Sequence, residues 1–142
     1  MAVHTWALGL AMAAWQKPST LIVVAESLRS PRGALLCALY DRPEGFPDRP
    51  AAGRPALAQR VPIDGRALCI FGSLAPGTYA LAVLHDENDN GRMDTNLLGM
   101  PREGWGVSGS RAGRRRRPRF SDSTFVVAAG RTQVLRVPIR YP

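Results

Sequence analysis

Histidine is nearly absent from this 142-residue sequence, which contains only His4 and His85. A catalytic triad or a transition-metal site that needs several histidines is therefore not expected. Cysteine is equally scarce, and Cys37 and Cys69 do not form a CxxC pair, which argues against zinc binding and dithiol redox chemistry. Each cysteine lies inside an apolar run. The two are expected either to form a disulfide in an oxidising compartment or to pack as small buried side chains.

No segment is expected to span a membrane, because no apolar run reaches the necessary length. Residues 1–16 contain no Lys, Arg, Asp or Glu and are apolar from Trp6 to Trp15. With a small-x-small cleavage site at Ala11-Met12-Ala13, they are predicted to be a secretory signal peptide, although a positive n-region is missing. The alternatives are an ordinary N-terminal helix or a start codon assigned too far downstream. The expected location is secreted or periplasmic.

What the sequence does contain is a series of short apolar runs separated by turns rich in Gly and Pro. Fourteen Gly and twelve Pro accompany them, and few stretches have a helical composition. Strands are predicted at residues 19–28, 34–40, 56–63, 66–74, 79–85, 125–128 and 132–141. A tight Asp64-Gly65 hairpin is expected between the third and the fourth. Residues 17–142 are thus predicted to form one all-β domain, an antiparallel β-sandwich of about seven strands.

Two connections are far longer than the hairpins of such a fold. Residues 41–55 contain four prolines and two glycines, and residues 86–123 form an insertion of nearly forty residues. A compact domain rarely carries a structureless connection of that length. The long loop 86–123 is therefore the expected location of the functional site, braced by short turns.

The segment that opens this loop has the ligand spacing of a calcium-binding loop. Ca²⁺ takes six to eight oxygen ligands, and a loop that curls around the ion presents them from alternate residues. Gly91 stands where such a loop needs a sharp turn. The candidate metal ligands are oxygen donors at fixed spacing: Asp86, Asn88, Asn90, the backbone carbonyl of Arg92, and Asp94.

The match to the helix-loop-helix calcium template is incomplete. Its twelfth position, normally a bidentate Glu, is Leu97, and no flanking helices are expected. The missing ligand would come from Asp94, from Asn96, or from Glu103 brought back by a rigid turn. So few charges predict weak binding, with a Kd on the order of 10⁻⁴ to 10⁻³ M, and a structural role for the ion. The alternative is a plain Asn-Asp-Asn-Gly turn without metal.

The net charge of +8 is unevenly distributed, because six arginines fall within nine positions: Arg111, Arg114, Arg115, Arg116, Arg117 and Arg119. Such a run is expected to form a solvated loop, since like charges repel. The alternative is a metal-free binding module for anionic envelope glycans or phosphate, in which Arg114, Arg115, Arg116 and Arg117 bind the anion. No aromatic residues interleave the run, so nucleic acid is not an expected partner.

A catalytic constellation is not evident. Residues 106–110 resemble a nucleophile elbow around Ser108, but the closing Gly and the strand-turn-helix context are missing. His85 would be the only candidate base. A weaker alternative is a hydrolase that uses two of the carboxylates of Asp86, Asp94, Glu103 and Asp122. The protein is expected not to be an enzyme.

An ordered series of residues between Leu74 and Phe125 carries a family resemblance. The series is Pro76-Gly77-Thr78-Tyr79-Ala80, His85-Asp86-Glu87-Asn88, Asn90-Gly91, Asp94, Leu98-Gly99-Met100-Pro101, Glu103-Gly104-Trp105-Gly106, Ser108, Pro118, Phe120, Asp122 and Phe125. It resembles small bacterial exported proteins classed only as a domain of unknown function (DUF2141-like). The resemblance implies a transthyretin- or prealbumin-like β-sandwich and export, but no activity. It departs at Gly109-Ser110 and in the arginine run.

The expectation that follows is a non-catalytic exported protein whose long loop is ordered by Ca²⁺. This loop would present a surface to an unknown envelope or extracellular partner.

Overall fold

The computed structural model describes residues 16–47, 57–109 and 117–142. Residues 1–15 of the predicted signal peptide, and the arginines at 111 and 114–116, lie outside these ranges. The elements in chain order are β1 (Ser19–Glu26), β2 (Ala34–Tyr40), β3 (Leu57–Pro62), β4 (Leu68–Leu74), β5 (Gly77–Asp86), β6 (Gly104–Val107), α1 (Phe120–Ser123), β7 (Thr124–Val127) and β8 (Thr132–Pro138). No helix in the described part of the chain is long and apolar enough to cross a membrane.

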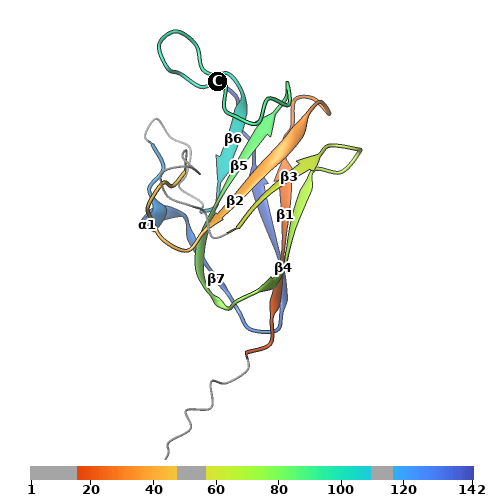
Figure 1. The fold of residues 1–142 in the computed structure, drawn as a ribbon, viewed down its shortest axis with the longest axis vertical. Coiled ribbons are helices and arrows are strands. Elements are labelled where there is room, and N and C mark those ends of the chain that lie inside the picture. Colours follow the sequence, from red (N-terminus) through yellow and green to blue (C-terminus); the bar gives the residue numbers. More distant parts are fainter. Residues whose placement is uncertain (1–15, 48–56, 110–116) are drawn as a thin grey trace, which may run out of the picture.

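The strands form two sheets that share one core, which confirms the all-β prediction (Figure 1). The smaller sheet has the order β4-β1-β8, and the larger has the order β3-β2-β5-β6, with β7 also paired to β5. All pairings are antiparallel except that of β1 with β8, which is parallel. The expected fully antiparallel arrangement is therefore wrong at this pair. Parallel neighbours need a long connection, and β1 and β8 lie almost the whole chain apart.

The long strand β5 is the centre of the larger sheet. The predicted alternation along it is confirmed, because Tyr79, Leu81, Val83 and His85 are all buried on the face toward the shared core. One edge of β5 pairs with β2. Its other edge pairs with β7 in the first half and with β6 in the second.

The outer face of the larger sheet carries a second, smaller apolar cluster. Phe46, from the segment after β2, packs edge to face against Tyr40 and Phe120, with ring centroids 5.3 and 5.9 Å apart. Ala80 and Val107 complete its buried part. This cluster covers β2 on its second face, as the continuous apolar character of residues 34–40 predicts.

Strand β6 lies inside the predicted long loop and was not recognised from the sequence. Its four residues, GWGV, have too little alternation to indicate a strand. A Cβ at Gly104 would lie 2.3 Å from the Tyr141 ring, and one at Gly106 would lie 2.6 Å from the Pro138 carbonyl oxygen. The two glycines therefore let the C-terminal segment pack directly on β6.

The predicted Asp64-Gly65 hairpin is wrong. The chain does bend at Gly65, which has a φ of +87°. However, β3 pairs with β2 in the larger sheet, whereas β4 pairs with β1 in the smaller one. Strand β3 is a largely exposed edge, while Cys69 and Phe71 of β4 are buried in the core. The connection therefore crosses between the sheets instead of folding β4 back on β3.

The two cysteines form a disulfide. Cys37 of β2 and Cys69 of β4 are both buried, with their Cα atoms 6.6 Å apart. The bond joins the larger sheet to the smaller one through the centre of the core. Of the two arrangements left open by the sequence, the structure has the covalent one.

Removing this bond is expected to lower the free energy of unfolding by about 3–4 kcal/mol, because it closes a loop between residues 32 positions apart. Urea unfolding of the wild type and of Cys37→Ala/Cys69→Ala, with and without dithiothreitol, measures the loss. The reductant should destabilise the wild type to a similar extent and leave the double variant unchanged. A wild type that is indifferent to reductant after complete thiol exchange would contradict the bond.

Gly33, just before β2, lies against the backbone at the end of β5. Its φ is +75°, and an added Cβ would lie 1.9 Å from the carbonyl oxygen of Asp86. Neither the backbone conformation nor the space permits a side chain.

Gly33→Ala is therefore expected to destabilise the fold by about 2–4 kcal/mol. Gly72→Ala in β4 is the matched control, because nothing lies within 4 Å of an added Cβ there, and its effect should stay within about 1 kcal/mol. The measurement is the urea midpoint of each variant. Equal midpoints for the two variants would show that Gly33 does not hold this junction.

Candidate functional site

The loop that follows β5 bends back on the carboxylate of Asp86. This side chain is fully buried at the end of the strand. Its Oδ1 accepts a hydrogen bond from the backbone N–H of Asn90 at 3.1 Å, and its Oδ2 accepts one from Gly91 at 2.7 Å. Positive φ angles at Asp89 (+56°) and Gly91 (+79°) make the bend possible. Glycine at the predicted turn position thus has a clear physical role.

Asp94 lies over the same bend and is held by both asparagines. The side-chain amide of Asn88 donates to Asp94 Oδ2, and that of Asn90 donates to Asp94 Oδ1 at 2.6 Å. The Oδ1 of Asn90 accepts the backbone N–H of Arg92 at 3.1 Å. The structure therefore brings the predicted loop residues into one hydrogen-bonded network.

Glu103 returns to this network after the intervening excursion. Only 5% of the residue is exposed. Its Oε1 accepts the backbone N–H of Glu87, and its Oε2 accepts that of Asp94, each at 3.1 Å. The expected approach of Glu103 to the loop is confirmed, and one carboxylate joins the first and last parts of the bend. Its role as a metal ligand stays a prediction.

The carboxylate of Glu103 is influenced by the charges of two other acidic residues of the loop, Asp94 and Asp86, and these three are here called the inner acids. Burial raises the pKa of Glu103, and the negative charges of Asp94 and Asp86 raise it further, against the lowering effect of its backbone hydrogen bonds. A buried carboxylate beside other negative charges favours either a bound proton or a bound cation.

The other two acidic residues of the loop, Glu87 and Asp89, here called the outer acids, form ion pairs with arginines. Glu87 accepts hydrogen bonds from Arg29 (2.6 and 2.9 Å) and from Ser30, and the Arg29 bond lowers the pKa of Glu87. The carboxylate of Asp89 accepts hydrogen bonds from Nε and Nη2 of Arg60, which lower the pKa of Asp89.

The contrast between the two sides is the main electrostatic feature of the loop. Among the described residues, no ion pair involves Asp86, Asp94 or Glu103. The outer acids have arginine partners, and the inner acids have only hydrogen-bond donors without net charge.

His85, the residue before Asp86 in β5, is fully buried. Its Nε2 lies 2.8 Å from the carbonyl oxygen of Arg32, so this nitrogen carries the hydrogen. Its Nδ1 then accepts the hydroxyl of Tyr141 at 2.6 Å. Tyr141 in turn accepts the backbone N–H of Arg29, whose guanidinium stacks on the ring with Cζ 4.4 Å from its centroid. His85 thus fixes the C-terminal segment against the loop.

The remaining sequence candidates do not join the loop. Ser108 is buried, and its Oγ accepts the N–H of Leu81 at 2.8 Å and donates to the Ser123 carbonyl. Of the proposed anion-binding arginines only Arg117 is described, and it is exposed. Within the described ranges, no three His, Cys, Asp or Glu side chains form a ready-made metal cluster. Any ion at the loop would also need amide and backbone oxygens as ligands.

Sequence reasoning missed the structure of the segment between Asp94 and Glu103. The side-chain Oδ1 of Asn96 accepts the backbone N–H groups of Leu98 and Met100 at 2.9 and 3.0 Å, which shapes residues 96–100 into a tight turn. The signal that could have indicated it is the apolar run Leu97-Leu98-Gly99-Met100 inside an otherwise polar loop.

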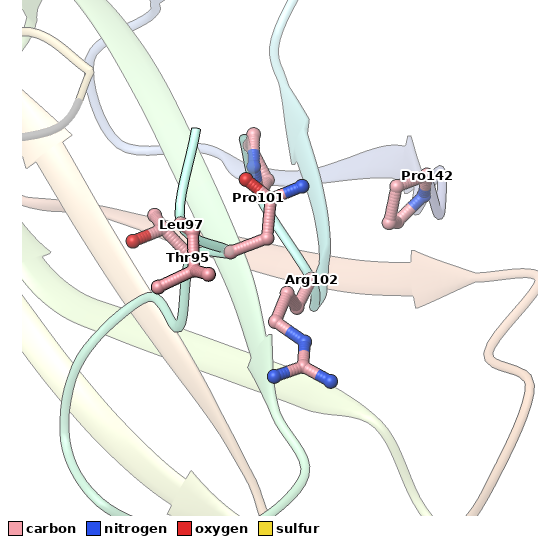
Figure 2. Close-up of a pocket in the computed structure, with 6 residues that line it drawn as sticks. Thr95, Leu97, Pro101, Arg102 and Pro142 are labelled. Atoms are coloured by element: carbon pink, nitrogen blue, oxygen red, sulfur yellow. The ribbon is translucent and has the colours of Figure 1, made fainter. Parts of the chain in front are cut away.

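Beside this turn lies an open depression of about 620 Å³, lined by Thr95, Asn96, Leu97, Pro101, Arg102 and Pro142. Figure 2 shows Pro142 on the opposite side from Thr95 and Leu97, with the Arg102 side chain between them. The depression is a surface feature beside the acidic network, and none of the three inner carboxylates lines it.

Comparison with known proteins gives one match. Residues 23–135 match the family described as "Uncharacterized protein conserved in bacteria (DUF2141)". The matched range begins in β1, ends in β8 and contains the whole acidic loop. No curated protein and no solved structure matches the chain. Because the match covers most of its length, the chain belongs to this uncharacterised bacterial family.

Proposed function

We propose that the loop between β5 and β6 binds one calcium ion, which fixes the long excursion to the end of the larger sheet. The observation that supports this most is the contrast between inner and outer acidic residues. Glu87 and Asp89 have arginine partners, whereas Asp86, Asp94 and Glu103 have no ion-pair partner among the described residues. A divalent cation would offset two of these three negative charges.

The donor set of the loop suits calcium. Carboxylates, side-chain amides and a backbone carbonyl are hard oxygen ligands, and no sulfur or imidazole accompanies them. The amides of Asn88 and Asn90 now present their NH₂ groups to Asp94. A half-turn of each amide would place a carbonyl oxygen there instead. Without an ion, the present hydrogen bonds make the loop a stable turn, which is the alternative that the experiment below decides.

The same proposal includes an exported and non-catalytic protein with a prealbumin-like sandwich. The disulfide between Cys37 and Cys69 supports export, because such bonds persist mainly in oxidising compartments. A weak calcium site also suits extracellular modules. Both ring nitrogens of His85 are bonded within the protein, and the Ser108 hydroxyl is buried, which supports a role without catalysis.

The first test is stability and calorimetry with calcium. Millimolar Ca²⁺ is expected to stabilise the wild type by about 1–2 kcal/mol relative to EDTA, given a Kd on the order of 10⁻⁴ M. Removing a ligand charge in Asp94→Asn or Glu103→Gln should weaken binding about tenfold or more. Isothermal calorimetry and thermal melts provide the two readouts.

Asp89→Asn is the matched control for these variants. It removes the same charge from the same loop, but from the side bonded to Arg60, so its calcium affinity should stay near the wild-type value. Identical melts of the wild type in EDTA and in calcium, with no heat of binding, would rule out the proposed ion.

A second prediction concerns pH. The raised pKa of Glu103 means that, without metal, its stabilising contribution is present below the unfolded value of about 4.3 and is lost as pH rises through the folded pKa. Calcium needs the ionised form. The increase in melting temperature caused by calcium should therefore be small near pH 4 and grow toward pH 7. Glu103→Gln should flatten this trend, and an unchanged trend in that variant would exclude Glu103 as the titrating ligand.

A further inference from the structure

The two most exposed large apolar side chains among the described residues, Leu97 and Leu98, lie on one turn together with the exposed Met100. Leu97, Leu98 and Met100, here named the apolar tip, have exposed fractions of 106%, 84% and 56%. Figure 1 shows the turn as the teal loop at the upper end of the long axis, opposite the beginning of β1. We infer that the apolar tip enters the interfacial layer of an anionic lipid membrane.

The tip is built to hold these side chains outward. Asn96 makes two side-chain and two backbone hydrogen bonds within the turn, the latter with Met100 and Gly99 at 2.9 Å. A bridge between Thr95 and Pro101 closes its neck. The backbone is therefore already ordered, so insertion costs little further conformational entropy. These bonds fix the backbone from which the exposed side chains of Leu97 and Leu98 project.

Two arginines flank the apolar tip in the sequence, beside the acidic network that contains Asp94 and Glu103. Arg92 and Arg102 are exposed, and neither forms an ion pair with an acidic residue in the described ranges. Arg102 is fixed at the neck, because its backbone N–H donates to the Asp94 carbonyl at 2.8 Å. Arginines at this level would meet lipid phosphates while the apolar tip lies deeper. The net charge of +8 favours approach to an anionic surface.

The shape of the tip favours a bilayer over a protein surface. A stable protein interface covers roughly 800 Å² on each partner around an apolar centre. Here the apolar side chains are confined to a narrow turn, and the exposed arginines Arg92 and Arg102 lie on either side of it in the sequence. Such a projection fits a soft interfacial layer that closes around it. The inference does not depend on calcium, because Asn96 holds the turn through hydrogen bonds to backbone groups within it.

The experiment is co-sedimentation of the disulfide-bonded protein with lipid vesicles in EDTA, so that calcium cannot bridge protein and lipid. Equal parts of phosphatidylglycerol and phosphatidylcholine should bind the wild type, whereas pure phosphatidylcholine should bind it weakly. Replacing Leu97 and Leu98 by serine should reduce partitioning by roughly tenfold per leucine. Arg92→Gln/Arg102→Gln should also reduce it and should weaken its dependence on salt.

The matched control is Ile70→Ser/Val134→Ser, which removes two exposed apolar side chains from the smaller sheet. This variant should bind vesicles like the wild type. The melting temperature of each variant is measured in parallel, and vesicle binding is compared at a temperature at which all variants are folded.

Three outcomes would overturn the inference. They are absence of wild-type binding to anionic vesicles, undiminished binding after loss of both leucines, and equal loss in the control variant. Sedimentation velocity adds a fourth: self-association that requires Leu97 and Leu98, without vesicle binding, would make the tip a contact between copies of this chain.

Discussion

The long insertion depends on the two hydrogen bonds that the carboxylate of Glu103 accepts from the backbone. This carboxylate accepts the backbone N–H groups of Glu87 and Asp94 and so closes a ring between the end of β5 and the approach to β6. Burial of an acid at this point is costly, and its pKa is raised accordingly. The arrangement nevertheless fixes both the acidic bend and the neck of the apolar tip. One residue thus connects the proposed ion site with the proposed membrane contact.

The features that sequence predicted well are those set by local spacing. Alternation from Tyr79 to His85 identified β5 because the side-chain period of a strand is two. The bend around Asp86 followed from oxygen donors at alternate positions and a glycine that accepts positive φ. The return of Glu103 was anticipated because Pro101 and Gly104 flank it in a turn-forming context. Each inference needed only residues near one another in the chain.

The features that sequence did not reveal depend on contacts between distant residues. Arg29 and Glu87 lie 58 positions apart, and Arg60 and Asp89 lie 29 apart, so nothing local marks them as partners. Strand β6 owes its existence to the space that Gly104 leaves for the C-terminal segment. The prediction of a hairpin at Asp64-Gly65 was wrong for the same reason. Local residues favour a turn there, but packing in the core determines the sheet to which β4 belongs. Cysteine spacing likewise could not decide between a bond and simple burial.

The parallel pairing of β1 with β8 has a consequence for how the protein is made. Strand β1 occupies the middle of the smaller sheet and pairs on one side with residues 132–138, which lie more than a hundred positions later in the chain. The smaller sheet therefore cannot be completed until residues 132–138 have left the ribosome. Until then the apolar edge of β1 has no permanent neighbour, and contacts this distant in sequence form slowly. A nascent chain of this protein would remain accessible to chaperones until β8 is available to pair with β1.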